Sequence, residues 1–213
     1  MNRLPHTASG ISSGAFMAVQ HHVVWSNDVD GVGVIAGGPF WCANANAITA
    51  QTACMKMPSL INLSELVAVT HATFATGFID DPRNLQGDRI WLFSGSKDTE
   101  VKTGVVEKLQ DYYLQMGVAP SDVQFIRNVS AAHSMPTLSF GNPCSYLGPP
   151  YINACEYDAA GALLNAVVSE RSAPNLKPPS ASSAPSPTRL ITFSQKRYAP
   201  LVGLEAAGLS EIG

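Results

Sequence analysis

Hydrophobic residues follow two patterns along the chain: short apolar runs, and longer segments in which they recur at helical spacing. The apolar runs at residues 31–37 and 90–94 and the alternating segment at residues 122–129 predict three strands, the first of them buried as in a parallel sheet. Helical spacing predicts helices at residues 14–26, 63–77 and 101–116. Because strands and helices alternate, we expect an α/β fold with a mostly parallel sheet.

The helix predicted at residues 14–26 carries an apolar face that we expect to pack on the sheet, consisting of Phe16, Val19 and Val23 and widened by Met17 and Val24. His21 and His22 lie next to each other on this helix, so their side chains diverge. We therefore interpret them as surface or groove residues rather than as metal ligands. The helix at residues 63–77 opens with a capping-box pattern, Asn62 followed by Glu65.

Composition narrows the class of protein. The chain has 213 residues, 46% of them hydrophobic and 14% charged, which predicts a globular protein with one substantial core. A net charge of −3 with no cluster of lysine and arginine argues against binding to nucleic acid or to an acidic membrane surface. No apolar run is long enough to span a membrane, and residues 1–6 do not lead into the apolar core of a signal peptide.

A motif for nucleophilic chemistry precedes the first helix. Residues 10–14 read Gly-Ile-Ser-Ser-Gly, the Gly-x-Ser-x-Gly spacing of a nucleophile elbow, in which a serine stands on a tight turn between a strand and a helix. We expect glycine on both flanks, Gly10 and Gly14, because neighbouring backbone must approach closely. Ser12 is the candidate nucleophile, and the backbone N–H of Ser13 is the candidate donor to an oxyanion.

An acid and a histidine occupy matching positions later in the chain. Asp98 lies in the loop after the strand at residues 90–94, and His133 lies in the loop after the strand at residues 122–129. Serine, acid and histidine in this order, each after a strand, form the arrangement of the catalytic triad in α/β hydrolases. The pattern predicts ester hydrolysis through an acyl-enzyme, with His133 as general base and Asp98 holding its ring.

Two aromatic residues and four cysteines lie in loops. Phe40 and Trp41 follow the strand at residues 31–37, where ligands bind in parallel sheets, so they are candidates for substrate binding, although they could equally cover the core. The cysteines form two local pairs about a dozen residues apart, Cys42 with Cys54 and Cys144 with Cys155. Local disulfides in an oxidising compartment are the favoured interpretation; four reduced thiols and other connectivities stay open.

Several segments together resemble the extracellular poly(3-hydroxybutyrate) depolymerases of the circularly permuted single-domain branch. The resemblance covers residues 8 to about 170 and rests on residues 9–20, 31–39, 93–98 and 141–144. It implies an α/β-hydrolase-like three-layer sandwich, a triad of Ser12, Asp98 and His133, an oxyanion donor at Ser13 and two local disulfides. It also implies cleavage of polyester without metal or cofactor, aromatic surface residues that grip the polymer, and an extracellular or periplasmic monomer.

The chain also departs from that family's pattern. Residues 1–171 resemble a partial catalytic domain, residues 172–188 form a linker rich in Pro, Ser and Ala, and residues 189–213 begin with a predicted strand at 189–194. The family's following segment, which carries a His-Gly-Cys stretch and a tryptophan of the substrate surface, has no counterpart. The resemblance therefore implies a permuted and incomplete domain, cut at both ends.

Three functions from different classes are compatible with the sequence. The first is a serine ester hydrolase acting on poly(3-hydroxybutyrate) or its oligomers. The second is a carboxylesterase for small or carbohydrate-linked esters, because no residue pattern defines the acyl group. The third is a remnant that keeps the triad but has no activity.

Overall fold

A computed structural model describes residues 6–168, 189–194 and 207–212 of the chain. The chain divides into two compact units, residues 1–176 and residues 177–213. In the second unit, β8 (Arg189–Ser194) pairs with β9 (Ala207–Ile212) as an antiparallel hairpin, so the strand predicted at 189–194 is confirmed. The predicted linker at 172–188 lies outside the described residues.

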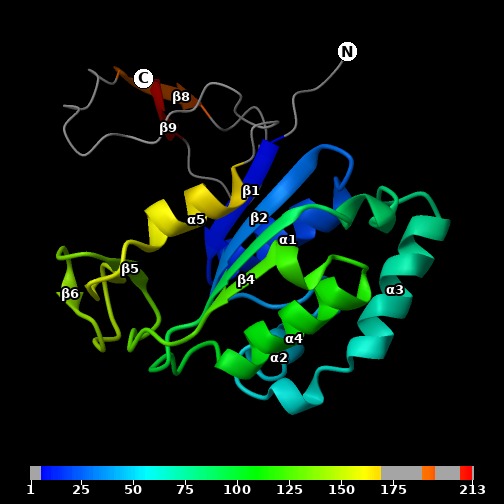
Figure 1. Ribbon diagram of the computed structural model, residues 1–213, viewed down its shortest axis with the longest axis horizontal. Coiled ribbons are helices and arrows are strands. Elements are labelled where there is room, and N and C mark those ends of the chain that lie inside the picture. The colour runs from blue at the N-terminus through cyan, green and yellow to red at the C-terminus, as the bar shows by residue number, and fades with distance from the viewer. Residues whose placement is uncertain (1–5, 169–188, 195–206, 213) are drawn as a thin grey trace. The chain divides into compact units, whose positions relative to one another are not determined.

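A four-stranded parallel sheet forms the centre of the first unit (Figure 1). Its strands are β1 (His6–Ile11), β2 (Val29–Ile35), β3 (Arg89–Phe93) and β4 (Val123–Ile126), in the order β1-β2-β3-β4. All seven residues of β2 are buried, whereas β1, at one edge of the described sheet, is only partly buried. The carboxyl ends of these strands lie at one edge of the sheet, where parallel sheets present their functional loops.

Helices cover both faces of this sheet (Figure 1). On one side lie α1 (Ser13–Val24) and α4 (Thr103–Gln115), with α3 (Leu63–Ala75) packed outside α4, and on the other lies α5 (Ala159–Val167). The side chains of β2 show both contacts. A Cβ added at Gly33 would lie 2.4 Å from Leu163 of α5, while Val34 points toward α1 and its neighbouring loop. The three-layer α/β sandwich expected from the sequence is therefore confirmed.

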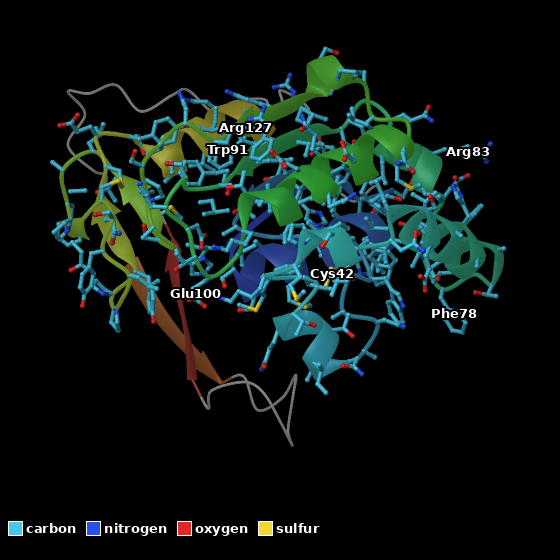
Figure 2. The ribbon with its side chains drawn as sticks, turned by 90° about the horizontal axis from the view of Figure 1, so that it is seen from below. Cys42, Phe78, Arg83, Trp91, Glu100 and Arg127 are labelled. Atoms are coloured by element: carbon cyan, nitrogen blue, oxygen red, sulfur yellow. A yellow bond between two sulfur atoms is a disulfide. The ribbon has the colours of Figure 1, made fainter. Side chains whose placement is uncertain are left out.

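Stacked aromatic rings fill the layer between the sheet and α5. Trp91 and Phe93 lie on the same face of β3 with their ring centroids 6.0 Å apart, and Tyr157 stacks on Phe93 at 5.8 Å. Figure 2 shows Trp91 beneath the yellow α5. Because Ile90 and Leu92 point to the opposite face and are also buried, β3 reads as a continuous apolar run.

Shorter elements complete the first unit. The helix α2 (Ala47–Gln51) lies in the loop after β2, and three short 3-10 helices each begin at a proline: Pro58–Leu60, Pro82–Leu85 and Pro120–Asp122. A small second sheet has the order β5-β7-β6, with β5 (Met135–Thr137), β6 (Asn142–Pro143) and β7 (Ile152–Ala154). The side chain of Asn153 donates to the carbonyl oxygens of Cys144 and Tyr146 at 3.0 and 2.8 Å, which ties this sheet together.

The buried face of α1 differs from the one predicted. Its buried residues are Ala15, Ala18, Val19, His22 and Val23, while Phe16 is only partly buried and Met17 is 64% exposed. The reason is the close approach of the loop after β2, where a Cβ at Gly37 would lie 2.9 Å from the Ala15 side chain. Only small residues fit toward this loop, and Met17 lies on the exposed side of α1. In the described residues, no helix has the length and apolar character needed to cross a membrane.

Candidate active site

Ser12 occupies a strained turn between β1 and α1. Its backbone has φ 56° and ψ −123°, a region that non-glycine residues rarely adopt and that costs about 1–3 kcal/mol. The turn is held from both sides, because the Ser12 N–H donates to Ile35 O at 2.9 Å and Phe16 N–H donates to Ser12 O at 3.0 Å. This geometry is that of a nucleophile elbow.

The two glycines of the motif have different roles. A Cβ at Gly10 would lie 2.3 Å from the backbone of Gly14, so no other residue fits there without moving the turn. A Cβ at Gly14 would meet nothing within 4 Å. The expectation that both flanks need glycine is therefore wrong for Gly14, because a side chain at this position of α1 would point into open space.

Substitutions at these glycines are expected to differ sharply. Gly10→Ala should destabilise the fold by about 3 kcal/mol or more, because the clash is with backbone. Gly14→Ala should change stability by no more than about 1 kcal/mol, since alanine is a better helix former than glycine. Urea unfolding followed by circular dichroism measures both values, and similar values for the two variants would contradict this account of the turn.

Asp98 is fixed in the loop after β3. One carboxylate oxygen, Oδ1, accepts hydrogen bonds from the N–H groups of Glu100 at 2.8 Å and Val101 at 2.9 Å. The other, Oδ2, lies 2.8 Å from His133 Nδ1. The Asp98 side chain is 1% exposed, so this contact is shielded from solvent. These backbone hydrogen bonds therefore fix the orientation of the Asp98 carboxylate that contacts His133.

His133 lies between β4 and the small sheet, on a loop that is joined to the Asp98 loop by hydrogen bonds. Lys97 N–H donates to Ala131 O at 3.0 Å, and Ser96 N–H donates to Val129 O at 2.9 Å. A carboxylate beside Nδ1 favours the neutral tautomer that carries its proton on Nδ1, which leaves Nε2 as the proton acceptor.

Ser12 and His133 line the same cavity, of about 450 Å³. The other residues that line it are Ile11, Met55, Glu100, Leu147 and Tyr151. The structure therefore brings Asp98 and His133 into contact and places Ser12 and His133 around one space. In Figure 2, Glu100 marks this side of the molecule, away from Phe78 and Arg83 beyond the end of α3.

The backbone N–H of Ser13 lies at the amino terminus of α1. The first N–H groups of a helix have no acceptor inside the helix, and the helix dipole favours negative charge there. Ser13 also lines a second cavity, of about 550 Å³, that it shares with Ser12. Its N–H is accordingly in a suitable place to donate to an oxyanion formed at a carbonyl attacked by Ser12.

The two aromatic residues predicted to bind substrate differ in their exposure to solvent. Phe40 is 3% exposed and belongs to the core, so it is not available to a ligand. Its neighbour Trp41 is 42% exposed and lines the second cavity. The difference arises because Trp41 has φ 59°, which turns its side chain to the surface. Sequence spacing alone could not separate the two.

The two local cysteine pairs are disulfide-bonded in the structure. Cys42 is joined to Cys54, and Cys144 to Cys155. The first bridge lines the second cavity, and Figure 2 shows Cys42 close to α1, drawn in dark blue. The second bridge links the loop after β6 to the end of β7, within the small sheet that follows His133 in the sequence. In the ranges that the structure describes, no group of three or more His, Cys, Asp or Glu residues could hold a metal ion.

His22 is not the surface residue that the sequence suggested. It is fully buried, with Nδ1 2.9 Å from the Tyr113 hydroxyl and Nε2 3.1 Å from Asp88 Oδ2. Burial raises the pKa of Tyr113, so this hydroxyl stays protonated. The partners are 91 and 66 residues away in sequence, which is why the pattern of the helix alone did not find them.

Loss of this buried pair is expected to affect stability rather than chemistry. His22→Ala should lower the free energy of unfolding by about 3 kcal/mol, because it leaves Asp88 without one of its buried partners. His21→Ala, at the neighbouring exposed position, is the matched control and should cost less than about 1 kcal/mol. Thermal unfolding compares the two, and equal stability would contradict a structural role for His22.

The parallel sheet covered by helices on both faces, with a serine turn and a His–Asp pair beyond the carboxyl ends of its strands, places the chain in the α/β-hydrolase class of folds. The sequence of the chain is similar to those of poly(3-hydroxybutyrate) depolymerases. It is 40% identical over 204 residues to a poly(3-hydroxybutyrate) depolymerase of Delftia acidovorans and 33% identical over 177 residues to a polyhydroxybutyrate depolymerase of Talaromyces funiculosus.

These matches cover 95% and 79% of this chain but only 40% and 49% of the two relatives, so the chain spans less than half of their length. Its fold is similar to the crystal structure of a PHB depolymerase from Penicillium funiculosum, with a TM-score of 0.78 and 26% identity over 98% of this chain and 65% of that one. A PHB depolymerase complexed with an R3HB trimer matches equally well. No family model matches the chain.

Proposed function

We propose that the chain carries the catalytic triad of a serine ester hydrolase, with Ser12 as nucleophile, His133 as general base and Asp98 as the group that orients His133. The observation that carries this proposal is the 2.8 Å contact between His133 Nδ1 and Asp98 Oδ2, on a cavity that His133 shares with Ser12. The rare backbone conformation of Ser12 supports it independently.

The proposed reaction has two halves. His133 Nε2 takes the proton of Ser12 Oγ as that oxygen attacks the ester carbonyl, and it then gives this proton to the departing alkoxide. Water attacks the resulting acyl-enzyme in the second half: His133 takes a proton from the water and returns it to Ser12 Oγ as the acid product leaves. Ser13 N–H stabilises the oxyanion in both halves, and one such donor contributes about 3 kcal/mol.

The proposed substrate is poly(3-hydroxybutyrate) or its oligomers. Both curated relatives are named as depolymerases of this polyester, and one structural neighbour is a complex with an R3HB trimer. The two disulfides are typical of proteins from oxidising compartments, and we propose an extracellular or periplasmic location. We further propose that the chain acts as a monomer, without cofactor and without nucleic-acid or membrane partners.

The substrate proposal is tested by comparing two assays on the 213-residue chain. One measures 3-hydroxybutyrate released from polymer granules and from the trimer, and the other measures hydrolysis of p-nitrophenyl butyrate. Release from the trimer and the polymer supports the depolymerase proposal. Hydrolysis of the nitrophenyl ester alone would favour a carboxylesterase for small esters, and hydrolysis of neither would contradict the proposed function.

A further inference from the structure

The second cavity, of about 550 Å³, is distinct in chemistry from the one that contains His133. It opens beside Ser12 and Ser13, and no residue that lines it carries a charged side chain. Its apolar walls come from the exposed side of α1, the Cys42–Cys54 loop with Met55 after it, and the end of the loop before α4, and they include Phe16, Met17, Trp41, Met55 and Val101. A space of this kind fits an apolar group of a molecule that reacts with Ser12.

Trp41 is held in place at this cavity although it is exposed. Its backbone N–H donates to Gln20 Oε1 at 3.1 Å, and its indole N–H donates to Asn44 Oδ1 at 3.0 Å. Gln20 is itself anchored on α1, where its Nε2 donates to Phe16 O at 3.3 Å. The ring also lies 6.2 Å from the Phe40 ring, centroid to centroid. A fixed aromatic surface loses little conformational entropy when a ligand packs on it.

The direction of the reaction assigns the two cavities to different parts of an ester. The general base protonates the departing alkoxide, so the alcohol part lies on the side of His133. The cavity that contains His133 is shared with Ser12, whereas the apolar cavity is shared with Ser12 and Ser13 and does not include His133. The acyl part, which stays bound to Ser12, is therefore left to the apolar cavity.

We infer that the apolar cavity binds the acyl part of the ester, that Trp41 determines specificity for acyl chains long enough to reach its ring, and that Gln20 and Asn44 are positioning residues for Trp41. The inference rests on the proposed function of Ser12. It predicts that kcat/KM depends on the length of the acyl chain, because a longer alkyl chain contacts the Trp41 ring and an acetyl group does not.

The test compares kcat/KM for p-nitrophenyl hexanoate and p-nitrophenyl acetate. Trp41→Ala should lower the hexanoate-to-acetate ratio about tenfold or more, and Trp41→Phe, which keeps a ring but loses the bond to Asn44, should lower it less. The control is Trp25→Ala: Trp25 is 48% exposed and does not line the cavity, so the ratio should stay within about twofold of the wild-type value.

Positioning by Gln20 is tested by two substitutions of similar length, of which only one keeps an acceptor for Trp41 N–H. Gln20→Met keeps the length of the side chain but removes the acceptor for Trp41 N–H, so the ratio should fall about threefold or more. Gln20→Glu keeps an acceptor for Trp41 N–H but loses the donor to Phe16 O, so the ratio should fall less than in Gln20→Met. If Gln20→Met lowers the rates for both esters equally, Gln20 has only a structural role and this part of the inference is wrong.

The outcomes separate the two proposals. If the wild-type chain hydrolyses both esters and Trp41→Ala leaves the ratio unchanged, the inference about the acyl cavity is wrong while the proposed function stands. If the folded chain hydrolyses neither ester, the proposed function fails and the inference fails with it.

Discussion

Replacement of Ser12 by alanine is expected to lower ester hydrolysis by at least about 10⁴-fold. The reason is that His133, which contacts Asp98, can only activate a nucleophile on the cavity that it lines together with residue 12, and alanine offers none. The substitution keeps a Cβ and therefore the backbone strain of the turn, so stability should change little. Steady-state hydrolysis of p-nitrophenyl butyrate, with the unfolding curve recorded for the same preparation, measures both quantities.

The control for this variant is Ser9→Ala, an exposed serine three residues earlier on β1. Its rate should remain within about twofold of the wild-type rate, because Ser9 lines neither cavity. If Ser12→Ala retained a tenth or more of the activity, another group would have to be the nucleophile.

Replacement of Asp98 by asparagine is expected to lower kcat about 10³- to 10⁴-fold without loss of the fold. Asparagine can keep its oxygen toward the N–H groups of Glu100 and Val101, since these two bonds both go to Oδ1 in the native chain. Its amide nitrogen then replaces Oδ2 and donates toward His133 Nδ1. This reverses the tautomer, so the proton moves to Nε2 and His133 can no longer act as a base.

Long-term steady-state assays at high enzyme concentration reach the low rates expected for this variant. Asp111→Asn, on the exposed side of α4, removes the same charge away from the site and should keep the rate within about twofold. A loss of less than tenfold for Asp98→Asn would show that the His133–Asp98 contact does not orient a catalytic base.

Much of the fold could be predicted because it depends on local patterns. The apolar runs at β2 and β3 and the helical spacing of α3 and α4 give elements within a few residues of those observed. Each candidate triad residue follows a strand of one parallel sheet, and the loops after such strands gather at one edge. This is why chain order alone placed Asp98 and His133 near each other.

What sequence reasoning missed depends on contacts between distant segments. The freedom of Gly14, the exposure of Met17 and the burial of His22 are all decided by how α1 lies against loops and helices that come later in the chain. The separation of Phe40 from Trp41 depends on a left-handed backbone at Trp41, which Gln20 and Asn44 support from two different elements. No spacing rule contains this information.

The most direct measurement of the central claim is mass spectrometry of the folded chain after reaction with a fluorophosphonate, which phosphonylates serines that a neighbouring base activates. We expect a single adduct on Ser12, which is lost when the protein is unfolded before treatment and forms much more slowly in His133→Ala. The absence of an adduct on the folded chain, or an adduct on a different serine, would contradict the claim.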